Sequence, residues 1–385
     1  MSSSQLPSVS DVIRVADALS EPIVELTARL SEVPAPTNDE GLRAKAVREE
    51  MERLGYVDVA EDELHDVTGK IPGKDNSKTL LLAAHIDTVF PHDVDLTVTR
   101  DGDVLRGPGI GDNTLSVASA LLIGEALRQL GVTPAVDLIV TGNVGEEGLG
   151  DLRGMRAVVD SLSNIGGAIA IEGHSRGRIT HRGVGSRRLR VSVTGPGGHS
   201  WGNAGLPSAV HHLARIVAAL DEIPLTDDPK TSFNAGLFEG GISVNTIAPT
   251  AVAVLDMRSG NADALAALVA EVERVIAMPT PEGVSVEVEV VGDRPAGSLP
   301  RDSGLVPIAA KVHQELGIDV IYDESSTDAN IPISRGIPSI CIGLTTGGNV
   351  HRVDEYIDIP PLAKGFAQLV LTTLRSAEAI ARGDV

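Results

Sequence analysis

The stretch LLLAAHIDTVFP, residues 80–91, decides the fold class of this chain. It begins as a short apolar run with the length and composition of a strand that is buried on both faces. Two more runs of this kind follow, VDLIVTG at 136–142 and AIAIEG at 168–173. A stretch from Thr114 to Leu130, closed by Gly131, has helical character and lies between the first two runs. The order strand, helix, strand predicts an α/β fold with parallel strands in its sheet.

The chain is long enough for two domains, because its 385 residues exceed the usual size of a single core. Its middle part alternates strand-like and helical segments, which indicates a separate α+β module. The closing strand SICIGL at 339–344 and a last helix from Pro361 to Ala381 restore the α/β pattern. We therefore expect one domain at 1–184 and 294–385, interrupted by an inserted domain at 185–293. A third small unit at the C-terminal end is the alternative.

Composition excludes several classes of partner. The formal net charge is −21, and aromatic residues make up 2% of the chain, with Trp201 as its one tryptophan. A strongly acidic chain without aromatic stacking platforms is not expected to bind nucleic acid. A single cysteine, Cys341, forms no intrachain disulfide, and no apolar stretch approaches the roughly 18 residues of a membrane span. No targeting segment is recognisable, so we expect a cytoplasmic protein without membrane contacts.

Polar side chains with metal-ligating atoms gather where the predicted strands and loops meet. Six of them precede the inserted domain and a seventh follows it: His85, Asp87, Asp112, Glu146, Glu147, Glu172 and His351. Open α/β sheets place their chemistry at the carboxyl ends of the strands, so we expect these residues to share one site. Two imidazoles and three carboxylates suit a pair of divalent cations. The pattern therefore predicts a hydrolase with two zinc ions.

Each of these residues also has a simpler explanation when it is taken alone. His85 and Asp87 would be ordinary polar residues at a strand end, and Asp112 after GPGIG would be a helix N-cap. Glu146 and Glu147 are flanked by glycines and would be solvated in an exposed loop. Buried together, the two carboxylates repel each other unless a cation offsets their charge. GPGIG is not a phosphate-binding loop, because the GK[ST] that completes such a loop is absent.

Together these motifs resemble the di-zinc exopeptidase and amidohydrolase family that contains aminoacylase, acetylornithine deacetylase, succinyl-diaminopimelate desuccinylase, glutamate carboxypeptidase and peptidase T. The resemblance extends from about Pro22 to Ala381. It implies a catalytic, metal-binding domain with a central mixed sheet flanked by helices, and an inserted α+β domain that serves as a lid and for dimerisation. It also implies metal-dependent hydrolysis of an amide bond in a small peptide or an N-acyl amino acid.

The resemblance further implies two metal shells that share one carboxylate. His85, Asp112 and Glu172 would hold one zinc ion, and Asp112, Glu147 and His351 would hold the other. Co²⁺ and Mn²⁺ are the expected substitutes for zinc. These assignments follow from the match to the family's motifs, residue by residue.

Catalysis in the family also needs a base. By resemblance Glu146 would be the general base for the attacking water, and Asp87 would orient the imidazole of His85. Many members follow the bridging aspartate with Met-Lys or Asp-Lys, whereas this chain has Asn113 and Thr114. The alternative function is a metal-binding homologue without turnover that acts as a ligand-binding or scaffold protein. Retention of Glu146 argues against it, because that carboxylate is not needed to hold metal.

The inserted domain carries three further positions that match the family. His199 in TGPGGHSW matches a histidine that reaches the active site of the partner subunit in a homodimer. Asn245 in GGISVNTIAP and Arg258 in VLDMRSG match positions that contact substrate. Arg258 is expected to bind a free carboxylate of the substrate. Without the resemblance, His199 would be a turn residue after glycines, and the other two would be polar residues at strand ends.

Overall fold

The computed structural model describes residues 6–385, and this part of the chain folds into two compact units. Unit 1 combines the chain up to Gly183 with Ser298–Val385, and unit 2 is Val184–Gly297. Each unit has an apolar core of its own. The roles of the units as catalytic domain and lid stay predictions.

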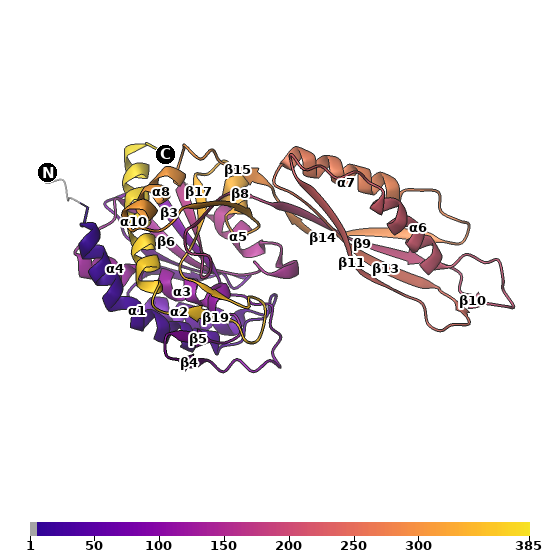
Figure 1. Ribbon diagram of the computed structural model, residues 1–385, viewed down its shortest axis with the longest axis horizontal. Coiled ribbons are helices and arrows are strands. Elements are labelled where there is room, and N and C mark those ends of the chain that lie inside the picture. The colour runs from indigo at the N-terminus through magenta and orange to yellow at the C-terminus, as the bar shows by residue number, and fades with distance from the viewer. Residues whose placement is uncertain (1–5) are drawn as a thin grey trace. The chain divides into compact units, whose positions relative to one another are not determined.

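Unit 1 is built around a mixed β-sheet (Figure 1). The strands of this unit are β1 (Val57–Glu61), β2 (Val67–Ile71), β3 (Asp75–His85), β4 (Thr99–Asp101), β5 (Val104–Arg106), β6 (Val136–Asn143), β7 (Ile165–Glu172), β8 (Arg178–Gly183), β16 (Ile321–Ser325), β17 (Ser339–Gly343), β18 (Gly347–Gly348) and β19 (Tyr356–Asp358). The central sheet has the order β1-β2-β6-β3-β7-β17-β8, and β16 pairs with β8. Strands β6, β3, β7 and β17 are parallel, whereas β1, β2 and β8 are each antiparallel to a neighbour. A smaller sheet has the order β18-β19-β5-β4.

Helices pack on both faces of the central sheet. They are α1 (Val9–Ser31), α2 (Gly41–Arg53), α3 (Leu115–Leu121), α4 (Ile123–Leu130), α5 (Arg153–Ser161), α8 (Val306–Glu315), α9 (Asn330–Ser334) and α10 (Leu362–Arg382). Helices α5 and α9 cover one face, and the other helices share the main core on the opposite face. The expected α/β fold, with a central mixed sheet flanked by helices, is therefore confirmed. No helix within residues 6–385 has the length and apolar character that crossing a membrane requires.

The central strand β3 shows why the sheet forms from these residues. Leu80, Leu82 and Ala84 pack into the main core, whereas Leu81 and Ala83 pack against the helices of the other face. All five side chains are fully buried. Successive side chains of a strand point to opposite faces, so an unbroken apolar run suits a strand that is covered on both. The prediction made from residues 80–84 is thus confirmed.

The single helix expected from Thr114 to Leu130 is wrong in one respect, because α3 and α4 take its place. Leu122 separates them with φ −87° and ψ 1°, which lies outside the α-helical region. Gly124 follows in the first turn of α4, and glycine is among the weakest helix formers. Thr114 itself belongs to an irregular turn, Ile110–Thr114, that precedes α3.

Unit 2 is an antiparallel sheet with two helices on one face (Figure 1). Its elements are β9 (Gly185–Thr194), β10 (Gly198–His199), α6 (Ala209–Asp221), β11 (Thr231–Gly240), β12 (Thr246–Ile247), β13 (Thr250–Ser259), α7 (Ala262–Ile276) and β14 (Ser285–Arg294), and β15 (Gly297–Ser298) lies at the boundary with unit 1. The large sheet has the order β11-β13-β9-β14, and β10 pairs with β12. Strand β11 was not predicted: Phe233, Ala235 and Leu237 alternate with polar residues or glycine, but the alternation is short and much of the strand is exposed at the sheet edge.

Candidate metal centre

The sheet topology brings the strand-end residues to one edge. His85 is the last residue of β3, and Glu172 is the last residue of β7, which is parallel to β3. Glu146 and Glu147 follow β6, the parallel neighbour on the other side of β3. Parallel neighbours end at the same edge of a sheet, so four of the predicted residues meet there. His351 joins them from the loop between β18 and β19.

Two groups of potential ligands share the carboxylate of Asp112. His85, Asp112 and Glu172 form one group, Asp112, Glu147 and His351 form the other, and within each group the ligand atoms lie within 4.8 Å of one another. Oδ1 of Asp112 is 3.2 Å from Nε2 of His85, and Oδ2 is 3.1 Å from Nε2 of His351. Asp112 therefore lies between the two imidazoles, where one carboxylate is able to contact two cations.

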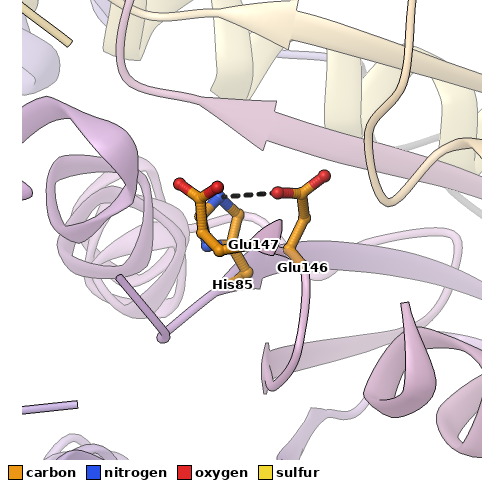
Figure 2. Close-up of side chains that lie close together, drawn as sticks. All are labelled: His85, Glu146 and Glu147. Carbon is orange, nitrogen blue, oxygen red and sulfur yellow. Dashed lines mark ion pairs between the residues drawn. The ribbon is translucent and has the colours of Figure 1, made fainter. Parts of the chain in front are cut away.

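Glu146 and Glu147 approach His85 from the loop after β6 (Figure 2). Oε2 of Glu146 lies 4.0 Å from Nε2 of His85. The carboxylate of Asp87 fixes this loop, because it accepts the backbone N–H groups of Glu146 (3.0 Å) and Glu147 (2.9 Å). Nδ1 of His85 is 3.2 Å from the Asp87 carbonyl oxygen and 3.5 Å from the carboxylate. Asp87 thus holds both the imidazole and the glutamate pair.

Carboxylates outnumber imidazoles at the site, and each kind of group shifts the pKa of the other. Burial lowers the pKa of His85, but the neighbouring carboxylates, Asp112 first among them, outweigh burial and raise that pKa well above its ordinary value. Asp112 and Glu147 raise the pKa of His351 to about 10. Burial raises the pKa of the Glu172 carboxyl to about 8. A divalent cation bound to the neutral rings would offset the same carboxylates, so this set of residues fits a divalent metal.

Two residues that sequence reasoning missed support the ligands through backbone contacts. Nδ2 of Asn113 donates to the carbonyl of Ile171 (2.8 Å), and its Oδ1 accepts the N–H of Gly173 (3.2 Å), so it ties the Asp112 turn to the end of β7. Nη1 of the buried Arg43 donates to the carbonyl of Ile86, between His85 and Asp87, at 3.0 Å. No motif signals either contact, because the partners are main-chain atoms far away in the sequence.

His199 and Asn245 lie side by side in unit 2. Strand β10 pairs His199 with Thr246, and the N–H of Ser200 donates to the carbonyl of Asn245 at 2.9 Å. Nδ1 of His199 accepts the backbone N–H groups of Trp201 (3.1 Å) and Gly202 (3.2 Å). In the neutral ring the proton is then on Nε2, so the exposed imidazole presents a donor.

Arg258 does not lie with His199 and Asn245. It is near the end of β13, and the eight residue-to-residue steps from Thr250 to Arg258 span roughly 26 Å at the usual rise of a strand. Nε of Arg258 donates to Oδ2 of Asp256 at 2.6 Å. Of the three positions predicted in unit 2, Arg258 is therefore at the far end of β13 from Thr250, the end that follows β12 and Asn245.

The fold and this cluster of metal-ligating side chains are those of a metal-dependent hydrolase. The sequence matches peptidase family M20/M25/M40 over residues 81–375. The chain belongs to this family and is a hydrolase of the metallopeptidase type. The expected family is thereby confirmed.

Individual relatives are similar over almost their whole length. The uncharacterized protein YqjE of Bacillus subtilis is 24% identical over 92% of this chain and 98% of its own. Carboxypeptidase G2 of Pseudomonas is 26% identical over 89% of this chain and 86% of its own. The crystal structure of a tripeptidase from Staphylococcus aureus superposes with a TM-score of 0.79 at 20% identity, covering 93% of this chain and 99% of that one.

Proposed function

We propose that the protein hydrolyses an amide bond in a small peptide or an N-acyl amino acid with the help of two zinc ions. His85, Asp112 and Glu172 would hold one ion, and Asp112, Glu147 and His351 the other. One observation carries this proposal: two groups of potential ligands share Asp112. The names of two similar proteins, a carboxypeptidase and a tripeptidase, support a peptide substrate.

Glu146 is the residue that this geometry favours as general base. When bound, two divalent cations lower the pKa of a water molecule and polarise the scissile carbonyl. Glu146 is buried and lies beside His85 at 4.0 Å; it forms a third group of potential ligands with His85 and Glu147 but is outside the two groups that share Asp112. Its backbone N–H is held by Asp87, which fixes the point from which the Glu146 side chain extends toward His85. Glu146 then takes a proton from the attacking water and delivers it to the leaving nitrogen.

Unit 2 would complete the site as the lid of a homodimer. His199 presents an Nε2–H donor that suits a substrate carbonyl in the partner subunit's site. Large apolar side chains near it are open to solvent, with Trp201 87% and Val244 103% exposed. Exposed apolar residues of this size mark contact surfaces, which supports a dimer. Arg258 would bind the substrate carboxylate, and its guanidinium would then give up part of its contact with Asp256.

A substrate panel tests the proposal. The purified protein is loaded with Zn²⁺ or Co²⁺ and offered dipeptides, tripeptides and N-acyl amino acids. We expect two metal ions per chain by elemental analysis, turnover of at least one class, and reversible loss of activity in chelator. Full activity in strong chelator, or metal content near zero after zinc loading, would contradict the two-metal site. Two bound ions without any turnover would favour the alternative, a metal-binding homologue that acts as a ligand-binding or scaffold protein.

A further inference from the structure

A buried carboxylate, Glu355, holds the turn that carries Asp112. Its side chain is 0% exposed. Oε1 accepts the backbone N–H groups of Gly111 (3.0 Å) and Asp112 (2.8 Å), and Oε2 accepts that of Gly109 (3.0 Å). Charged acceptors make stronger hydrogen bonds to N–H groups than neutral ones do. Glu355 also lies four residues after His351, so it links the segments of two candidate ligands.

His174 joins a third segment to this carboxylate. Its Nε2 lies 2.8 Å from Oε1 of Glu355, and it follows Glu172 by two residues. The imidazole fills the space beside two glycines: a Cβ on Gly111 would lie 2.2 Å from its Nε2, and a Cβ on Gly347 would lie 2.9 Å from its Cε1. Gly111 and Gly347 belong to the segments that carry the other two ligands. The ring is therefore packed where all three segments meet.

We infer that His174 and Glu355 are positioning residues that fix Asp112 between the two metal sites. None of the ligand groups found within residues 6–385 contains either residue, so they would act through the backbone of the turn. Without Glu355, three backbone N–H groups of the turn lose their acceptor, and buried groups of this kind seek other partners. The turn would then move, and Asp112 with it. This inference rests on the proposed two-metal site.

The first measurement is metal binding by the folded protein. His174→Ala and Glu355→Gln should weaken Co²⁺ binding about tenfold to a hundredfold, the usual effect of removing a residue that orients a ligand. The double variant should lose less than the product of the two single effects, because the residues act as one pair. His92→Ala is the matched control: Nε2 of His92 contacts Asp39 at 2.8 Å in an exposed pair, and neither residue belongs to a ligand group found within residues 6–385. It should bind Co²⁺ as the wild type does.

The second measurement needs no metal. Hydrogen exchange of the segment 107–114 in metal-free protein should be faster in His174→Ala and Glu355→Gln than in the wild type, and unchanged in His92→Ala. The fully buried His313 lies on α8 and belongs to none of the ligand groups found within residues 6–385, so His313→Ala shows what lost stability does to both readouts.

The two measurements separate the inference from the function on which it rests. Wild-type Co²⁺ affinity in both variants, or exchange of the turn no faster than in the His313 variant, overturns the positioning role. A wild-type protein that binds no Co²⁺ instead defeats the proposed two-metal site. The exchange experiment then still decides whether the pair holds the turn.

Discussion

Glu146 and Glu147 are adjacent carboxylates whose surroundings give them different tasks. Oε1 of Glu147 is 2.9 Å from Nε2 of His351, and the residue belongs to a group that includes Asp112. Glu146 is separated from His85 by 4.0 Å. Asp87 holds the backbone of both, so the difference between them lies in the direction of each side chain.

Glutamine substitutions at these two positions should therefore have different results. Glu146→Gln should lower kcat at least about a hundredfold, the usual scale for losing a general base, with metal content almost unchanged. Glu147→Gln should lower both activity and metal content, since it removes a charged ligand. Steady-state kinetics and elemental analysis on the same preparations check both. Near-normal turnover by the Glu146 variant would contradict its role as base.

Arg258 is expected to recognise a carboxylate on the substrate. A planar guanidinium binds a carboxylate with two parallel hydrogen bonds, and a chain of net charge −21 needs a local cation to capture an anion. Arg258→Ala should lower kcat/KM much more for a substrate acid than for its C-terminal amide, and Arg258→Lys should recover part of the loss. Equal losses for acid and amide would instead make Arg258 a structural partner of Asp256.

At the scale of elements, the sequence was informative wherever burial alone decides the structure. The strand at residues 80–84 was predictable, because its neighbours cover both faces and leave no room for polar residues. Strand β11 was not predictable in this way. It lies largely exposed at a sheet edge, and its backbone pairing with β13 leaves no mark in the amino-acid sequence. The break at Leu122 was missed for a similar reason: helical spacing continues through it.

The same distinction applies to the site. Ligating side chains at strand ends were predictable, because β3, β6 and β7 are parallel neighbours. The supports were not: Glu355 binds backbone groups some 240 residues earlier in the chain, with the largest separation at 246 residues. Arg43 and Asn113 likewise contact carbonyl or amide groups that any residue supplies. Their roles depend on the folded turn rather than on a motif.

His313, a buried residue of α8, should make the stability of the protein depend on pH. Burial lowers the pKa of His313 from 6.5 to about 4. The unfolded chain therefore binds more protons than the folded one between these values, and the free energy of unfolding falls as pH drops below 6.5. By pH 4.5 this group should have lowered the free energy of unfolding by roughly 2 kcal/mol.

Denaturant unfolding between pH 7.5 and 4.5 tests this. His313→Leu should show a smaller loss of unfolding free energy on acidification than the wild type, whatever its stability at pH 7.5. His92→Leu, at a half-exposed site, should keep the wild-type dependence. Parallel curves for the wild type and the His313 variant would show that this histidine is not the cause.

At the scale of the whole molecule, the two units divide the predicted catalytic residues between them. The candidate ligands and Glu146 all belong to unit 1, whereas His199 and Asn245 belong to unit 2. Figure 1 shows β10, which carries His199, at the end of a loop beyond the large sheet of unit 2. A histidine on such a loop, next to exposed apolar side chains, suits delivery to a second copy of the chain.

Mixed dimers decide whether His199 acts across the subunit interface. A His199→Ala chain and a Glu146→Gln chain are each expected to form inactive dimers. If His199 serves the partner's site, a heterodimer has one site with both residues intact and one site with neither. Random exchange makes half of the dimers mixed, so the mixture should recover about a quarter of wild-type activity per dimer. Differently tagged chains establish that exchange has occurred. An active His199→Ala dimer would show that His199 has no catalytic part. If both parent dimers are inactive and activity stays absent despite exchange, His199 serves its own subunit, because a residue acting within one chain leaves every site of the mixture defective.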